Sequence, residues 1–146
     1  MITITKLCKE DLAGLKKLYD NGFEGTNTDF IKMNEGYDWM KNNPDYTILC
    51  AKYENEIVGS LMGVANREII GECRPFLVIE NVVVSDNHRR MGIGSLLMEG
   101  IEKVAREKDC SFMMLISRMH RTGAHKFYES AGFSGDAAKG FKKYLD

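Results

Sequence analysis

The sequence predicts a single mixed α/β domain, and three observations support that prediction. The chain has 146 residues, a length typical of one domain with its own hydrophobic core. Its composition is 44% hydrophobic and 28% charged, as in globular proteins. Short β-branched or apolar runs alternate with segments in which apolar residues recur at helical spacing. We therefore expect residues 1–146 to form one domain that contains both strands and helices.

The first half of the chain shows both kinds of periodicity. Alternation between apolar and polar residues predicts strands, and a turn at Glu54–Glu56 between two such runs predicts a hairpin. Apolar residues at helical spacing, with Asn42–Pro44 as a stop, predict helices. The expected elements are the edge strand Ile2–Ile4, the helices Lys9–Asp20 and Asp29–Met40, and the hairpin strands Tyr46–Tyr53 and Ile57–Asn66.

The second half repeats strand and helix in alternation. The run Phe112–Ile116 is nearly all apolar, as expected of a central strand that is buried on both faces. Gly132 follows the last helix and suits a left-handed cap. The expected elements are a strand over Phe76–Val84, a helix with an apolar stripe from Ile93 to Ala105, the strand Phe112–Ile116, the helix Thr122–Ala131, and a segment Phe141–Leu145 that closes the sheet.

The segment that joins Phe76–Val84 to the third helix has the succession of strand, loop and helix that is typical of an anion-binding site. A β-branched strand end leads into a short loop with Arg89, Arg90, Gly92 and Gly94, and the loop opens directly into the helix. The first N–H groups of a helix lack partners within the helix, and an anion at that end accepts several of them. Glycine lets the backbone approach a phosphate closely, and arginine adds charge. A glycine-rich surface turn with exposed arginines is the alternative interpretation.

Two motifs in this half resemble the GNAT superfamily of N-acetyltransferases. Arg89-x-x-Gly92-x-Gly94 is similar to the family signature (Q/R)-x-x-G-x-(G/A), and Ala124–Phe133 is similar to A-x-x-F-Y-x-x-x-G-F. The resemblance implies the GNAT acyl-CoA N-acyltransferase fold, a mixed but mostly antiparallel sheet of about six to seven strands flanked by about four helices. A Rossmann nucleotide fold fits worse, because the third glycine of its motif would fall at Leu97.

The resemblance also implies acetyl-CoA as the cosubstrate, with no metal. In the family, the pantetheine arm pairs with the strand before the loop, backbone N–H there meets the thioester carbonyl, and the loop holds the pyrophosphate. Arg121 stands where many members carry an asparagine, so it either reaches a CoA phosphate or caps a loop. The implied cofactor-binding residues are Val82, Val83, Val84, Arg89, Arg90, Met91, Gly92, Ile93, Gly94, Ser95, Arg121 and Phe127.

The resemblance assigns an acid role to Tyr128, and the position of a carboxylate in an otherwise apolar strand makes Glu80 a second candidate for the chemistry. Tyr128 matches the family tyrosine near the sulfur, and a protonated phenol can supply a proton to the leaving thiolate. Glu80 is the candidate base or amine-orienting group, with Asn81 beside it as a second substrate-binding residue. A regular pleat would place Glu80 on the face of Val82 and Val84, and a bulge would alter this. A core aromatic and a structural ion pair are the respective alternatives.

The expected reaction is direct transfer of an acetyl group to the primary amine of a small molecule. Acidic residues between Asp20 and Asp45 suit a cationic amine, although they also suit an ordinary solvated surface. The strand Ile79–Val84, with Glu80 and Asn81, instead resembles that of glucosamine-phosphate acetyltransferases, and Arg67 and Arg74 suit a sugar phosphate. A catalytically silent acyl-CoA sensor is the alternative outside the enzymes, and it would not need Tyr128 or Glu80.

Charge and cysteine content exclude other classes. A net charge of −1 argues against a nucleic-acid partner, and no apolar stretch has the length of a signal peptide or a membrane span. The four cysteines are scattered without metal-binding spacing. We expect buried reduced thiols at Cys50 and Cys110 and a cytoplasmic protein. A homodimer is among the assemblies that the sequence leaves open.

Overall fold

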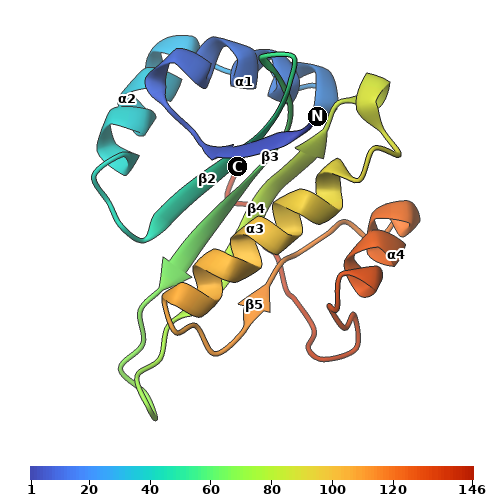
Figure 1. Ribbon diagram of the computed structural model, residues 1–146. Coiled ribbons are helices and arrows are strands. Elements are labelled where there is room, and N and C mark those ends of the chain that lie inside the picture. The colour runs from blue at the N-terminus through green and yellow to red at the C-terminus, as the bar shows by residue number, and fades with distance from the viewer.

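The computed structural model describes residues 1–146 and has a single five-stranded sheet with helices on both faces (Figure 1). The strands follow one another in the order β1-β2-β3-β4-β5. The first three pairings are antiparallel, and β5 alone runs parallel to its neighbour β4. The strands are β1 (Thr3–Lys6), β2 (Tyr46–Tyr53), β3 (Glu56–Asn66), β4 (Phe76–Val84) and β5 (Met113–Met114). The predicted mixed α/β class is confirmed.

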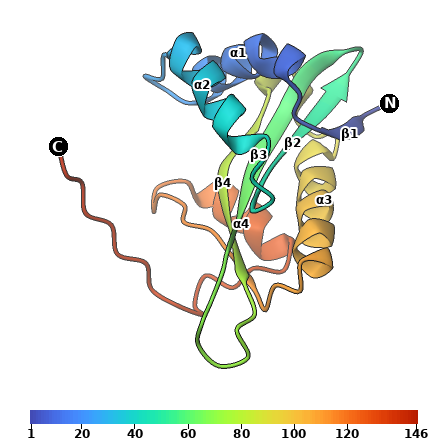
Figure 2. The same ribbon diagram turned by 90° about the vertical axis from the view of Figure 1, so that its left-hand side faces the viewer.

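The four α-helices divide between the two faces of the sheet (Figure 2). The pair α1 and α2 covers one face near the ends of β3 and β4, while α3 lies along the other face with α4 beside it. Turns of 3₁₀-helix, Lys9–Asp11 and Asp86–His88, precede α1 and the loop before α3. The helices are α1 (Leu12–Gly22), α2 (Phe30–Met40), α3 (Ile93–Glu107) and α4 (Thr122–Ser130).

Local hydrogen bonds fix where the first two helices begin. The Asp11 carboxylate accepts hydrogen bonds from the Cys8 backbone N–H and thiol, each at 3.0 Å, and pairs with Lys52 of β2 at 2.7 Å. This ties the start of α1 to the sheet. Asp29 caps α2 by accepting the Lys32 backbone N–H at 3.0 Å. No residue of α2 is fully buried, and the helix is attached through the half-buried Met33 and through Trp39, which packs on Tyr46 of β2.

The core lies between α3 and the sheet. The apolar stripe of α3 is buried as predicted, and it packs against Leu61, Leu77 and Ile79. Two glycines of β3 make the close approach of α3 geometrically feasible. A Cβ on Gly59 would lie 2.7 Å from Ile93, and a Cβ on Gly63 would lie 2.6 Å from Ile101. A smaller cluster of Leu15, Leu18 and Val83 holds α1 to the opposite face.

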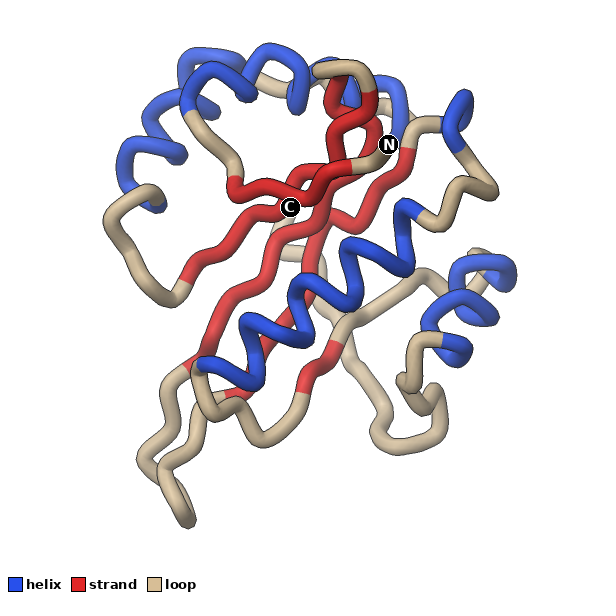
Figure 3. The backbone as a smooth tube through the Cα atoms, viewed as in Figure 1, coloured by secondary structure: helices blue, strands red, loops and turns tan.

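Two predictions about the end of the chain are wrong. The sheet has five strands rather than six or seven, because Phe141–Leu145 pairs with no strand. The predicted central strand Phe112–Ile116 shortens to β5, which lies at the sheet edge, and Phe112 and Ile116 are 53% and 62% exposed. A continuous apolar run indicates that both faces should be covered, but it does not indicate what covers them. Figure 3 shows the chain after α4 without helix or strand.

Candidate active site

A β-bulge in β4 governs the orientation of the candidate site residues. Met62 of β3 pairs with Glu80 and Ser60 pairs with Val83, so two β4 residues, Asn81 and Val82, oppose one residue of β3. Asn81 adopts a left-handed backbone conformation with φ of 57°. An extra residue of this kind is left out of the hydrogen-bond ladder. The bulge therefore leaves backbone N–H capacity free in the middle of β4.

The bulge reverses the pleat and corrects the predicted position of Glu80. Before it, Ile79 packs into the α3 core; after it, Val82 and Val84 pack there, and Val83 packs against α1. Glu80 thus shares the α1 face with Val83 and not the face of Val82 and Val84. The regular-pleat expectation was wrong because the bulge depends on β3–β4 pairing, which is not visible in the strand sequence alone.

The strands β4 and β5 separate just before the bulge. Their pairing is limited to Leu77 with Met113 and Val78 with Met114. From Ile79 onward, the β5-facing side of β4 is an open backbone edge inside the domain. An open edge accepts an extended ligand through main-chain hydrogen bonds. The split between β4 and β5 therefore suits an extended ligand whose amide groups can pair with the backbone of β4.

The loop beyond β4 presents backbone amides at the start of α3. Arg90 and Gly92 both have left-handed backbones, with φ of 66° and 73°, and such residues turn successive N–H groups to one side. No side chain caps α3, and its first turn contains no acidic residue. The first amides of α3 therefore remain available to an anion. Arg89 pairs with Asp86 at 2.8 Å, and both side chains are exposed.

The two motif glycines have different physical roles. Gly92 supplies the left-handed turn, and a Cβ there would meet no atom within 4 Å. Gly94 supplies space, because a Cβ there would lie 2.9 Å from the Phe127 ring of α4. Phe127 therefore packs α4 against the first turn of α3. The predicted cofactor role of Gly94 is thus accompanied by a packing role that joins the two motifs.

Tyr128 lies in the core next to this contact. It is 8% exposed and belongs to the α3 cluster, whereas Phe127 is only half-buried. Burial raises the pKa of the Tyr128 phenol above its usual value, and the charge of Arg121 opposes that shift without cancelling it. The phenol is therefore protonated at neutral pH.

Glu80 is exposed, lies opposite Met62, and forms no ion pair. It is a carboxylate on an otherwise apolar stretch of sheet, free to meet a cationic group. Asn81 is also exposed. Its main role in this structure comes from its backbone, which sequence reasoning did not single out. The available signal was its residue type, since asparagine tolerates left-handed dihedrals better than most residues.

The charged residues proposed to bind the acceptor are largely occupied. Of the acidic residues between positions 20 and 45, Asp20 pairs with Lys16, Asp38 pairs with Lys9 and Lys41, and Asp45 pairs with Arg67. Asp29 caps α2. Arg74 pairs with Asp109 and donates to the backbone carbonyls of Asp109 and Cys110. Neither the acidic surface nor the two arginines forms a ready binding site.

A sequence model of the acetyltransferase (GNAT) family matches residues 12–133. This match covers the bulged strand, the loop, α3 and α4.

The chain belongs to the GNAT acetyltransferase family.

One sequence relative and two solved structures illustrate what this chain is similar to. A Drosophila melanogaster protein described as a probable glucosamine 6-phosphate N-acetyltransferase is 33% identical over 96 residues, covering 64% of this chain and 42% of its own length. The chain thus spans less than half of that relative. A Bacillus halodurans C-125 transcriptional regulator has a TM-score of 0.90 at 22% identity, covering 99% of this chain and 100% of its own. The Arabidopsis thaliana glucosamine-6-phosphate N-acetyltransferase has a TM-score of 0.86 at 20% identity, covering 100% and 99%.

GNAT acetyltransferases use acetyl-CoA as the acetyl donor. The split between β4 and β5, the bulge and the uncapped start of α3 follow one another along the chain. The structure has no group of three or more His, Cys, Asp or Glu side chains placed to hold a metal ion. All four cysteines are free thiols, with Cys50 buried, Cys110 half-buried, and Cys8 and Cys73 exposed. None of the helices has the length and apolarity needed to cross a bilayer.

Proposed function

We propose that this protein is an N-acetyltransferase that transfers the acetyl group of acetyl-CoA directly to the primary amine of a small molecule. The observation that carries the proposal is the continuous path from the bulged, unpaired edge of β4 to the uncapped start of α3. A long donor with amides at one end and phosphates at the other matches that path. The Glu80 side chain stands on the α1 face of the same strand.

In this proposal, different residues along the path assist different steps of the acetyl transfer. Backbone N–H groups at Asn81–Val84 would polarise the thioester carbonyl, since donors aimed at developing negative charge supply about 2.7–4 kcal/mol each. The neutral amine attacks the carbonyl carbon, so a C–N bond forms and the C–S bond breaks. Tyr128 gives its proton to the departing thiolate. The proton lost by the amine passes to solvent, and the phenol is reprotonated from solvent.

We propose a cationic small amine as the acceptor class. Glu80 carries this proposal, because it is the exposed carboxylate on β4 that no cation of the chain neutralises. In this role Glu80 attracts the ammonium form and orients the amine once it has lost a proton. The acidic residues between positions 20 and 45 contribute less than the sequence suggested, because most of them are already paired or capping.

An amino-sugar phosphate is the second candidate acceptor. The 33% identity to the Drosophila melanogaster protein favours it. Against it, Arg67 and Arg74 are held by Asp45 and Asp109, so a sugar phosphate would have to displace an ion pair from either arginine. Substitution of both arginines by alanine therefore separates the two classes. It should leave turnover of a polyamine intact and abolish turnover of glucosamine 6-phosphate if that is the substrate.

A thiol-release assay tests the proposal directly. Acetyl-CoA is mixed with the protein and a panel of polyamines, aminoglycosides, lysine derivatives and glucosamine 6-phosphate, and free CoA thiol is followed. We expect turnover with at least one amine and an increase in the Michaelis constant for that amine in Glu80→Gln. Glu99→Gln, an exposed glutamate on α3, is the matched control. Acetyl-CoA binding without turnover on any amine would instead support the silent sensor, and absence of binding would reject both functions.

A further inference from the structure

The face of the sheet that carries Glu80 continues beyond α1 and α2 as an apolar strip without a helical cover. Phe76, Val78 and Glu80 occupy alternate positions of β4 before the bulge, so their side chains share one face. None of the three belongs to the cluster that holds α1 and α2 to the sheet. Figure 2 shows these two helices over the far end of β4 and no helix over its Phe76 end on that side.

Strand β5 widens this strip. Met114 pairs with Val78, and the Phe112 ring stacks on the Phe76 ring with centroids 5.0 Å apart and planes 10° apart. Phe112 and Met114 are 53% and 37% exposed. Together the two strands therefore offer a ligand a continuous apolar surface that runs from Glu80 to an open aromatic pair.

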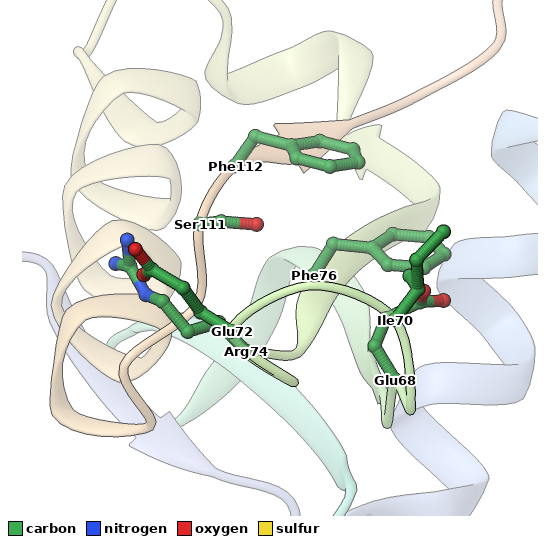
Figure 4. Close-up of a pocket in the computed structure, with 7 residues that line it drawn as sticks. All are labelled: Glu68, Ile70, Glu72, Arg74, Phe76, Ser111 and Phe112. Atoms are coloured by element: carbon green, nitrogen blue, oxygen red, sulfur yellow. The ribbon is translucent and has the colours of Figure 1, made fainter.

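The aromatic pair lines a pocket of about 440 Å³ where the β3–β4 loop meets the start of β5. Figure 4 shows Glu68 and Ile70 beside Phe76, whereas the Glu72 and Arg74 side chains point away from the two rings. Glu68 forms no ion pair. Aromatic ring faces and a free carboxylate are both groups that attract an ammonium ion. The far end of the strip therefore has the chemistry of a site for a cation.

Two unpaired carboxylates thus lie at opposite ends of an apolar strip. Glu80 lies at one end, next to the bulge, and Glu68 lies at the other end, beside Phe76. From position 76 to position 80 the strand advances about 13 Å at its usual rise of about 3.3 Å per residue. An extended chain with an ammonium group at each end and about eight to ten methylene groups between them has a similar length.

We propose that the acceptor is an α,ω-diamine with an apolar chain, and that Phe76, Phe112 and Glu68 form a distal subsite for its second ammonium group. The inference rests on the proposed acetyltransferase function and narrows its acceptor class. Glu80 orients the amine that loses its proton and receives the acetyl group, while the other amine stays protonated at the distal subsite. The products are the monoacetylated diamine and free CoA thiol.

The middle of the strip adds selectivity for the chain between the two amines. Val78 and Met114 offer no polar group to a ligand, so a methylene chain suits them better than a hydroxyl or a secondary ammonium group. Spermidine and amino sugars carry such polar groups at the corresponding place. A diamine with an unbroken methylene chain is therefore the preferred acceptor.

Thiol-release kinetics with four amines test the distal subsite. The amines are diaminooctane with both amines terminal, octylamine, putrescine and spermidine. The kcat/KM for diaminooctane should exceed that for octylamine about tenfold, the combined effect of a cation–π contact and an exposed ion pair. It should also exceed that for putrescine, which is too short to reach both carboxylates, and that for spermidine, whose middle nitrogen is charged. Equal kcat/KM for diaminooctane and octylamine would overturn the proposal.

Substitutions in the pocket assign the effect to particular residues. Glu68→Gln and Phe112→Leu should lower kcat/KM for diaminooctane toward that for octylamine and leave octylamine unchanged. Glu72→Gln makes the same charge change on the same loop, where the side chain points away from the rings, and should keep the preference for the diamine. A preference that survives Glu68→Gln, or that Glu72→Gln removes equally, would overturn the assignment.

Calorimetric titration of the CoA-bound protein separates this inference from the proposed function. Diaminooctane and octylamine are titrated into the wild type and Glu68→Gln, and the ratio of their dissociation constants is compared. A preference for the diamine that Glu68→Gln removes, without turnover of any amine, would support the subsite and reject acetyl transfer. Turnover of both amines with equal dissociation constants would keep the proposed function and reject the subsite.

Discussion

At the residue scale, the proposed acid can be tested without disturbing the core. Tyr128 is 8% exposed and packs among the residues of the α3 cluster. Tyr128→Phe removes the hydroxyl and keeps the ring, so the fold and acetyl-CoA affinity should be retained. Turnover at saturating substrates should fall about 10²-fold, the lower range of general acid catalysis.

The matched control for this change is Tyr46→Phe, a half-buried tyrosine on β2 whose ring packs on Trp39 of α2, away from the proposed site. Both variants are compared by the rate of CoA thiol release and by acetyl-CoA titration. Unchanged turnover in Tyr128→Phe would remove Tyr128 from the chemistry and leave it as a core aromatic.

The Asp11–Lys52 pair provides a stability prediction with a defined pH dependence. Burial alone would raise the Asp11 pKa, but the Lys52 ammonium and the Cys8 donors outweigh it, so the Asp11 pKa is lowered. Stability from Asp11 is therefore present above its unfolded pKa of about 4 and is lost as pH falls through the lowered value. Asp11→Asn should cost about 1–3 kcal/mol at pH 7 because it leaves Lys52 without its partner.

Urea unfolding of both proteins at pH 7 and at progressively lower pH measures this effect. The difference in unfolding free energy between them should shrink as the wild-type carboxylate becomes protonated. A constant difference across that range would show that the loss comes from packing and not from the charge pair.

At the element scale, the contact between α3 and α4 depends on Gly94. A Cβ at Gly94 would lie 2.9 Å from the Phe127 ring, closer than packed atoms tolerate. Gly94→Ala should therefore push α4 away from the first turn of α3 and cost about 1–3 kcal/mol in unfolding free energy, as overpacking does. It should also weaken acetyl-CoA binding, because that turn carries the proposed pyrophosphate amides.

Gly123→Ala is the control, since Gly123 lies in α4 with no atom within 4 Å of an added Cβ. Alanine there should be neutral or stabilise the helix by up to about 1 kcal/mol. Denaturant unfolding and acetyl-CoA titration are measured for both variants. If Gly94→Ala behaves like Gly123→Ala, the close approach of Phe127 does not constrain the site.

The same element shows which features could be predicted from sequence. The apolar stripe of α3 and the strand-loop-helix order are local patterns, so both were predicted correctly. The orientation of Glu80 was not, because the bulge arises from the register between β3 and β4, which are separated in sequence by a loop. The ion pairs of Arg67 with Asp45 and of Arg74 with Asp109 could not be predicted either, because the partners are distant in sequence. The edge position of Phe112–Ile116 was not predicted either, because it depends on the absence of a strand beyond β5.

At the scale of the whole molecule, the sheet is continuous from β1 to β4 and split between β4 and β5. Strand β3 pairs with one edge of β4. In the proposed complex, the pantetheine arm of acetyl-CoA would pair with the other edge as an added strand. Ligand binding stabilises the folded state as a whole, by about 2.7 kcal/mol at a hundredfold excess over Kd. The local effect should be larger along the split, because amides that lacked partners gain them there.

Hydrogen exchange with and without acetyl-CoA tests this prediction. Amides of residues 79–84 in β4 and Ile93–Ser95 at the start of α3 should become protected by at least about tenfold beyond the general stabilisation. The buried strand β2, which pairs on both edges, is the internal reference. Equal protection of β2 and the split would mean that the ligand acts only through global stability. Protection limited to α1 and α2 would place the donor on the opposite face and contradict the assigned path.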